Sequence, residues 1–85
     1  MRVWIVKDFE DTIVDVFKTK EGAYSYMCAE IARWKDEHPK EFTLSDYKNS
    51  KKQLDNEYKA NIGGMHTWLL NNGFYLKAGQ YNVKE

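Results

Sequence analysis

Four acidic residues lie close together near the start of the sequence: Asp8, Glu10, Asp11 and Asp15. Neighbouring carboxylates are the ligands that a hard cation such as Ca²⁺ requires, and such a cation takes six or more oxygens from a loop of defined geometry. This run lacks the Asp-x-Asp-x-Asp-Gly order of a calcium-binding loop. A solvated hairpin turn, whose charges discourage pairing at a sheet edge, accounts for the same residues, and we predict no metal site.

The single cysteine and the two histidines are the other residues able to bind zinc or to form a nucleophile–base pair. Cys28 falls on the apolar side of a predicted helix, His38 lies beyond that helix, and His66 belongs to a different element. No two of them have the spacing of a zinc ligand pair. A thiolate nucleophile also needs an accessible, electropositive setting. We therefore predict that Cys28 is buried and inert.

A pair of glycines, Gly63 and Gly64, precedes a predicted helix that contains His66. Helix N-termini attract anions, and glycine-rich loops can surround a phosphate group. A phosphate-binding loop would, however, follow a strand and continue into Lys-Ser or Lys-Thr, and neither feature is present. We interpret the pair as a helix–helix corner. The sequence thus predicts a non-enzymatic protein without a cofactor.

The second half of the sequence intermixes lysine with tyrosine, as proteins that bind single-stranded nucleic acids do. Residues 42–84 contain six lysines and three acidic residues, whereas residues 1–41 contain seven basic and nine acidic residues. Affinity for nucleic acids depends mainly on phosphate neutralisation, for which this excess is modest. Nucleic-acid binding by the lysine-rich middle helix is therefore the alternative hypothesis.

The chain contains more aromatic side chains than a small core needs, since thirteen of its 85 residues are Trp, Tyr or Phe. A chain of this length supports one core, so we expect a single domain over residues 1–85. Protein interfaces favour Trp and Tyr, and the surplus points to such an interface. Tyr26 and Trp34 are candidate anchors, although both could instead complete the core, which explains Trp34 at least as well.

Charge and hydropathy exclude several classes of protein. Thirteen basic residues balance thirteen acidic ones and 42% of residues are hydrophobic, which excludes a disordered tail, a collagen-like repeat and a polybasic arm. The longest apolar run, Val3 to Val6, is four residues long and too short to span a bilayer. One cysteine cannot form an intrachain disulfide, and no signal-peptide segment is recognisable. We expect a cytoplasmic protein.

Two strands and a helix are predicted for the first half of the chain. Residues 2–7 are β-branched or aromatic and apolar at both alternate sets, which indicates a strand that is covered on both faces or central in its sheet. Residues 12–17 form the second strand of an antiparallel hairpin. Thr19 is placed to cap a helix over residues 20–37, which ends before Pro39. Its apolar stripe consists of Tyr24, Met27, Cys28, Ile31 and Trp34.

The middle of the chain predicts two more helices. Thr43 and Asp46 have the spacing of a capping box for a helix that begins at residue 44 and reaches about residue 60. Its narrow face consists of Leu44, Tyr47, Lys51, Leu54, Tyr58 and Ile62. The pattern leaves open whether this helix docks on the sheet or projects from it. A short third helix is predicted over residues 65–71, with Met65, Trp68 and Leu69 facing inward.

Strand character returns at residues 74–77, followed by a bend or bulge at residues 78–80 and further strand at residues 81–83. The predicted order is therefore β-β-α-α-α-β. We expect an α+β fold of two layers, in which the N-terminal hairpin and the C-terminal strand form a three-stranded antiparallel sheet packed with two to three helices.

Residues 3–31 resemble the opening of small bacterial and bacteriophage ββα-type proteins of uncharacterised function. The shared pattern is a strand, Val3-Trp4-Ile5-Val6, an acidic turn, a second strand ending in Val16-Phe17-Lys18-Thr19-Lys20-Glu21, and an alanine-bearing helix. The resemblance covers about a third of the chain and transfers no catalytic residue. It implies a phage or prophage protein that acts by binding a host protein. Residues 40–72 depart from the compact version of the pattern.

These observations lead us to expect a non-enzymatic protein-binding module, such as a phage- or prophage-encoded modulator or inhibitor of a host or defence protein that acts by surface occlusion. The predicted contact residues are Tyr26, Trp34, Tyr47, Lys48, Lys51, Lys52 and Tyr58. The alternative is a nucleic-acid-binding accessory protein. Neither hypothesis involves a metal, a cofactor or a membrane, and neither defines the oligomeric state.

Overall fold

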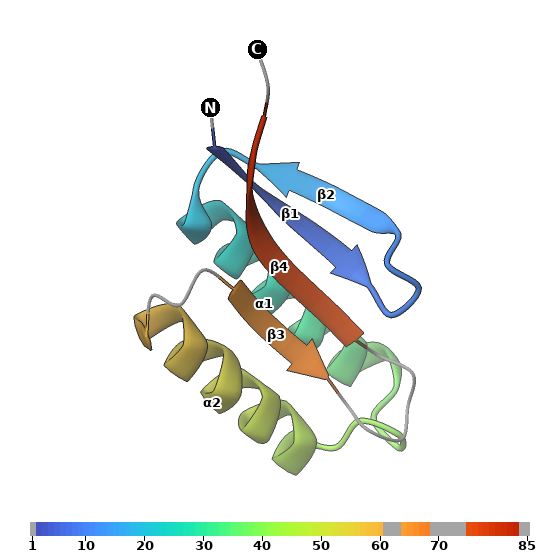
Figure 1. Ribbon diagram of the computed structural model, residues 1–85. Helices are drawn as coiled ribbons and strands as arrows, with labels where there is room; N and C mark the ends of the chain where they lie inside the picture. Colours follow the sequence, from blue (N-terminus) through green and yellow to red (C-terminus); the bar gives the residue numbers. More distant parts are fainter. Residues whose placement is uncertain (1, 61–63, 69–74, 84–85) are drawn as a thin grey trace.

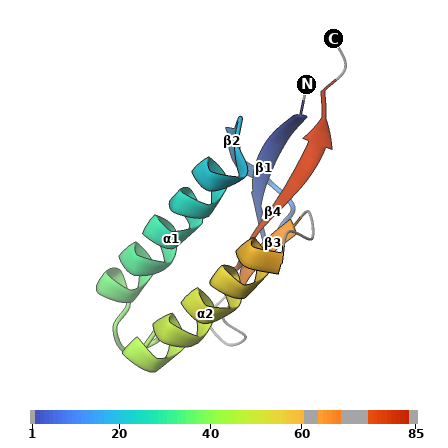
Figure 2. The same ribbon diagram turned by 90° about the vertical axis from the view of Figure 1, so that its left-hand side faces the viewer.

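The fold is a four-stranded antiparallel sheet with two helices. The computed structural model describes residues 2–60, 64–68 and 75–83, with the backbone alone at residues 66–68. Its elements are β1 (Arg2–Asp8), β2 (Ile13–Phe17), α1 (Lys20–Glu37), α2 (Leu44–Ala60), β3 (Gly64–Trp68) and β4 (Tyr75–Asn82). The strand order is β2-β1-β4-β3 (Figure 1). Both helices lie on one face of the sheet, and neither covers the other face (Figure 2). The expected α+β architecture is confirmed.

The sheet contains four strands rather than the predicted three. The hairpin and the C-terminal strand form β2-β1-β4 as expected, and β1 is central. The additional strand is β3, which pairs with β4 in the segment where residues 65–71 were predicted to form a helix. So short a helix has little stability of its own, and His, Thr and Trp favour extended backbone, so pairing with β4 prevails. Residues 69–71 lie outside the described part of the chain.

β4 is continuous where a bend or bulge was predicted at residues 78–80. Its pairing with β1 runs without a break from Leu76, opposite Asp8, to Asn82. The ring of Tyr81 lies over Gly79, 3.2 Å from the position that a β-carbon would occupy there. An aromatic ring thus covers the bare backbone of the glycine. The bulge of this sheet lies instead in the hairpin, where Val14 is the extra residue of β2.

Both helices begin where their capping residues predicted. The hydroxyl of Thr19 accepts a hydrogen bond from the N–H of Gly22 at 3.1 Å, and α1 has the predicted bounds. At the start of α2 the N–H of Asp46 donates to the hydroxyl of Thr43 at 3.2 Å, and the N–H of Thr43 donates back to the Asp46 carboxylate at 3.1 Å. This reciprocal pair is the predicted capping box, and it satisfies donors that a helix end leaves free.

The core lies between the sheet and the two helices. Its largest fully buried side chains are Phe42, Met27, Ile31, Leu54, Met65 and Val6. Phe42, in the loop between the helices, belonged to no predicted element. Its N–H donates to the carbonyl of His38 at 2.8 Å, and this turn returns the ring to the core. Leu44, which was assigned to the buried stripe of α2, is 56% exposed.

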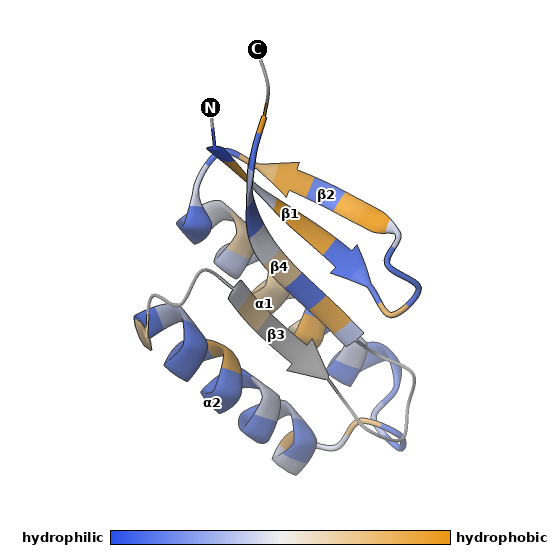
Figure 3. Cartoon of the chain, in the orientation of Figure 1, coloured by the Kyte–Doolittle hydropathy of each residue, from blue (hydrophilic) through white to orange (hydrophobic). Residues whose placement is uncertain are grey.

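α2 packs on the rest of the molecule instead of projecting from it. It contacts β3 and α1, and it buries Ser50 and Leu54 on that side. α2 is mostly hydrophilic, whereas most of β2 and the middle of β1 are hydrophobic (Figure 3). The helix layer therefore turns polar groups to solvent on one side of the molecule, and the sheet turns apolar groups outward on the other.

The placement of Phe42 predicts a large effect of truncation. Phe42→Ala removes a fully buried ring and is expected to lower the free energy of unfolding by about 3–5 kcal/mol. The same substitution at Phe9, which is 65% exposed, is expected to change it by less than about 0.5 kcal/mol. Urea unfolding followed by tryptophan fluorescence measures both. Phe42→Leu, with a cost of about 1 kcal/mol, keeps the comparison measurable if the alanine variant does not fold. Similar effects at positions 42 and 9 would contradict this placement.

Candidate interaction surface

Two of the predicted contact residues, Lys51 and Tyr58, lie in a polar seam between α1 and α2. The seam consists of Lys20 and Tyr24 from α1 with Lys51, Asp55 and Tyr58 from α2. The rings of Tyr24 and Tyr58 stack with their centres 4.3 Å apart. Lys51 Nζ donates to the Tyr24 hydroxyl at 2.9 Å and to the Asp55 carboxylate at 2.7 Å, and the Tyr24 hydroxyl donates to the same carboxylate. Lys20 Nζ donates to the backbone carbonyl of Tyr58 at 2.6 Å.

The pKa values of the seam residues are shifted away from neutral pH, so their protonation states stay constant there. The hydrogen bond to the Asp55 carboxylate raises the pKa of Tyr24 to about 12, and the same carboxylate raises the pKa of Lys51. Burial raises the pKa of Asp55, but its hydrogen bonds from Lys51 and Tyr24 outweigh burial, so that pKa lies below its ordinary value. A general acid or base works best with a pKa near the working pH, and these shifts lead away from neutrality. The seam therefore links the two helices and is poorly suited to proton transfer.

The other predicted aromatic anchors, Tyr26, Trp34 and Tyr47, are half-buried and pack against the core. The ring of Tyr26 lies 5.4 Å from that of Phe17, centre to centre. The ring centres of Trp34 and His38 lie 4.3 Å apart. These side chains thus take part in internal packing, which was the other interpretation that the sequence allowed for Trp34.

Lys48 and Lys52 lie on the outer side of α2, away from the seam. The exposed residues of this helix are Leu44, Ser45, Lys48, Asn49, Lys52, Asn56, Lys59 and Ala60. All of its acidic residues are only half-exposed, so the charge that α2 turns fully to solvent is positive. We call Lys48, Lys52 and Lys59 the α2 lysine face. The seven predicted contact residues therefore do not gather on one surface.

The residues that were considered for a cation site or a nucleophile, and for which neither role was predicted, have other surroundings in the structure. The Asp8 carboxylate accepts hydrogen bonds from the backbone N–H groups of Glu10 and Thr12, at 2.9 and 3.1 Å, and so shapes the hairpin turn. Burial raises the pKa of the half-buried Cys28 thiol, which makes a thiolate less accessible. Among the described residues, no three His, Cys, Asp or Glu side chains gather closely enough to hold a metal ion.

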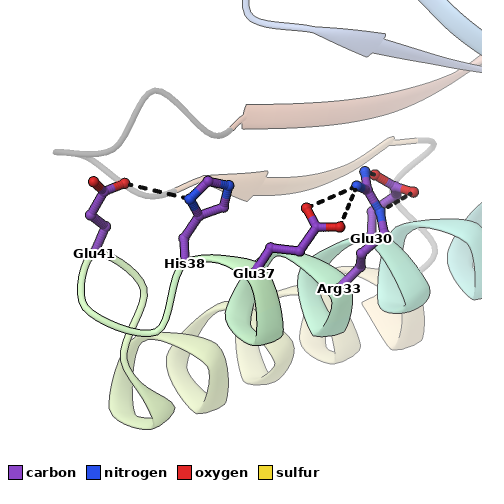
Figure 4. Close-up of polar contacts among 5 residues, drawn as sticks. All are labelled: Glu30, Arg33, Glu37, His38 and Glu41. Atoms are coloured by element: carbon purple, nitrogen blue, oxygen red, sulfur yellow. Dashed lines mark hydrogen bonds and ion pairs between the residues drawn. The ribbon is translucent and has the colours of Figure 1, made fainter.

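Ion pairs cover the outer side of α1 and the loop that follows it (Figure 4). Arg33 contacts both Glu30 and Glu37. His38 Nδ1 lies 3.9 Å from a carboxylate oxygen of Glu41, beside a shallow depression of about 250 Å³. This distance exceeds hydrogen-bond length, and both side chains are more than a third exposed, so they do not form an acid–base pair. The side chain of His66 lies outside the described part of the chain.

The uncovered side of the sheet is the surface that the sequence patterns did not predict. Its described residues are Ile13 and Val16 on β2, Val3, Ile5 and Lys7 on β1, and Tyr75, Lys77, Gly79 and Tyr81 on β4, with the bulge residue Val14 beside Ile13. We call this surface the open sheet face. The strongly exposed large apolar side chains of the described residues are Phe9, Ile13, Val14, Val16, Leu44, Tyr81 and Val83. All of them except Leu44 lie on this face, in the hairpin turn or at the end of β4.

The described charges on and beside the open sheet face are those of Lys7, Lys77 and Asp11. Asp11, from the hairpin turn, lies 2.8 Å from the ammonium group of Lys77 and 3.7 Å from that of Lys7. The hydrogen bond from Lys77, with Lys7 nearby, holds the pKa of Asp11 below its usual value. The ammonium group of Lys7 also lies 5.2 Å from the ring centre of Tyr81. The other described side chains of the face are uncharged.

Asp15 protects the free edge of β2. This exposed carboxylate accepts a hydrogen bond at 2.8 Å from the N–H of Val16. An edge N–H that is held by a side chain is not available to an added strand, and a charge on an edge strand opposes the approach of apolar backbone. The sheet therefore offers its face to a partner more readily than its β2 edge.

Comparison with protein-family models, with curated proteins and with solved structures finds no match to this chain. Over the described residues, neither helix combines the length and the apolar character needed to cross a bilayer. A function for the protein must accordingly be inferred from its own surfaces.

The seam predicts a loss of stability in alkali. The pKa of Tyr24 is raised from 10.0 to about 12, so its contribution is complete below pH 10 and is lost as the pH rises towards 12. The raised pKa of Lys51 acts in the same direction. We expect Tyr24→Phe to lower the free energy of unfolding near neutrality by about 1–2 kcal/mol. Above pH 10, the free energy of unfolding of this variant should decrease less steeply with pH than that of the unmodified protein. Urea unfolding between pH 8 and 11.5 measures both effects.

Tyr47→Phe is the control for this experiment, because it removes a half-buried hydroxyl outside the seam. Above pH 10, its free energy of unfolding is expected to decrease with pH as steeply as that of the unmodified protein. If Tyr24→Phe and the unmodified protein lose stability equally steeply above pH 10, the hydrogen bond between Tyr24 and Asp55 does not contribute as described.

Proposed function

We propose that this chain is a non-enzymatic protein-binding module whose contact surface is the open sheet face. The observation that supports this proposal is the exposure of Ile13, Val16 and Tyr81 on one uncovered face of the sheet, at 56%, 49% and 42%. Contiguous apolar surface rimmed by polar groups is typical of interaction sites on soluble proteins. The aromatic surplus noted in the sequence is consistent with this proposal through Tyr81, although most of the rings fill the core.

The open sheet face supports contact by packing and not by strand addition along β2. Asp15 opposes pairing along β2, whereas Ile5 and Val16 lie side by side on two neighbouring strands and present an uncharged surface. A partner that buries this surface removes apolar groups from water at about 25 cal/mol for each Å². Binding of this kind occludes the surface of the partner and requires no chemistry.

The finer proposal concerns the kind of partner. The resemblance of residues 3–31 to small bacterial and bacteriophage proteins supports a phage- or prophage-encoded modulator or inhibitor of a host or defence protein. In that role the two helices form a rigid backing layer, and the open sheet face is the part that meets the host protein. We place the protein in the cytoplasm in this proposal, where such a partner would be met.

A binding experiment with matched substitutions tests the proposed surface. The tagged protein is immobilised, exposed to a bacterial lysate, and the bound proteins are identified by mass spectrometry. Val16→Lys places a charge on the open sheet face, and we expect it to reduce capture of any specific partner at least tenfold. Leu44→Lys introduces the same charge at a similarly exposed leucine of α2, 56% against 49%, and should bind as the unmodified protein does. Equal capture by all three proteins would contradict the proposed surface.

A second candidate function is nucleic-acid binding, which the α2 lysine face favours. This face lies on the helix layer and is distinct from the open sheet face, and it presents three lysines without a fully exposed acid on the same helix. Lys51 is not part of it, because its ammonium group is held by Tyr24 and Asp55. Three phosphate contacts would make affinity for a single strand fall with salt at a log–log slope of about −2.

This alternative predicts that the triple substitution Lys48→Glu, Lys52→Glu and Lys59→Glu abolishes binding of a fluorescent single-stranded oligonucleotide at low salt. Lys18→Glu, at an exposed site between β2 and α1, serves as the control and should reduce affinity only slightly. Fluorescence anisotropy at several salt concentrations measures the affinity and its slope. Absence of binding by the unmodified protein at low salt would exclude the α2 lysine face as a nucleic-acid site.

A further inference from the structure

We propose that, in the free protein, the open sheet face is covered by the same face of a second copy, so that two sheets pack face to face about a twofold axis. The inference rests on the proposed function, because it assigns an occupant to the same surface. A target protein that fits the face better than the second copy would displace it. In this proposal the protein is a dimer until a target protein binds.

The first support comes from β1, which is apolar on both of its faces. Trp4 and Val6 face the helices and are buried. Val3 and Ile5 face the other way; Val3 is only 7% exposed, whereas Ile5 is half-buried and lies beside Val16 of β2. Strands with two apolar faces belong to sheets that are covered on both sides. Within the described residues, the chain supplies a cover for one side only, and a second molecule completes the other.

The second support is that the β2 edge of the sheet is unsuited to self-association. Two copies of β2 pairing antiparallel about their midpoint would place Asp15 directly opposite Asp15 of the other copy, since this residue is the third of the five from Ile13 to Phe17. Like charges opposite one another destabilise a strand pair. The same carboxylate also occupies the N–H of Val16. Face-to-face packing avoids both penalties.

The third support is area. β1 has seven residues, which at about 3.3 Å each gives a length of roughly 23 Å, and four strands spaced about 4.8 Å apart give a width of roughly 19 Å. The face therefore projects to roughly 400 Å², and its accessible area is larger because side chains corrugate it. Two such faces project to roughly 800 Å², and the added area of the corrugated side chains brings the total towards the lower limit of about 1,200 Å² for specific interfaces. Interfaces at this limit belong to reversible complexes, which suits a face that must later accept a target.

The fourth support is electrostatic. The chain has no formal net charge, so two copies do not repel one another at long range. On the face itself, the described charges are those of Lys7 and Lys77, and Asp11 lies against both at one end. The other described side chains of the face are uncharged, so the like charges that a second copy brings are those of Lys7 and Lys77, each of which has Asp11 beside it. A face of this kind is complementary to itself.

Sedimentation equilibrium of the full chain between about 5 and 500 μM tests the proposal, because this range covers the micromolar dissociation constants of reversible dimers. We expect the unmodified protein to change reversibly from monomer to dimer. Val16→Lys should raise the dissociation constant of the dimer at least tenfold. Leu44→Lys, which places the same charge on the helix layer, should leave it within twofold. Val16→Thr keeps the β-branched shape and should weaken the dimer less, which provides a folded variant if the lysine variant unfolds.

The possible outcomes separate this inference from the proposed function. A protein that stays monomeric at the highest concentration overturns the inference, and so does a dimer that Val16→Lys leaves intact or that Leu44→Lys disrupts. A monomer that still captures a target protein, and loses it in Val16→Lys, overturns the dimer while retaining the proposed function. A dimer sensitive to Val16→Lys, with no target captured, supports the inference and counts against the proposed function.

Discussion

The pairing of the first strand with the last holds this structure together. β1 forms seven consecutive pairs with β4 and also pairs with β2, so it lies at the centre of the sheet although it begins the chain. β3 joins the sheet only through β4. The helices in turn pack on side chains such as Val6 and Ala78, which the β1–β4 register places opposite one another. Without this long-range pairing, β3 would be separated from β1 and β2, and the helices would have no continuous sheet on which to pack.

The geometry of the two layers explains why one side of the sheet stays uncovered. The helices contain 18 and 17 residues, which corresponds to roughly 26 Å each. Two helices side by side, about 10 Å apart, span about the width of four strands. The helices are therefore just sufficient to cover one face. The polar seam of Tyr24, Lys51 and Asp55 holds them together as one layer, and the apolar side chains on the opposite face remain available for binding.

The same residue types serve different purposes according to where the fold places them. Lysine stabilises the interior seam at Lys51, neutralises a hairpin carboxylate at Lys77, and faces solvent at Lys48. Tyrosine stacks between the helices at Tyr58 and covers a glycine on the sheet at Tyr81. Composition alone suggested a surplus of aromatic and basic side chains for binding, whereas the packing uses many of them internally.

Local signals in the sequence determined the hairpin, both helices and their caps, because each depends on residues within a few positions of one another. Thr19, Thr43 and Asp46 are examples, and their hydrogen bonds are those that their spacing predicted. β3, the burial of Phe42 and the open sheet face were decided by the tertiary structure alone. Each of them depends on which distant segment lies alongside: the short segment of β3 becomes a strand only beside β4, and Val16 stays exposed on an open face because both helices pack on the other face.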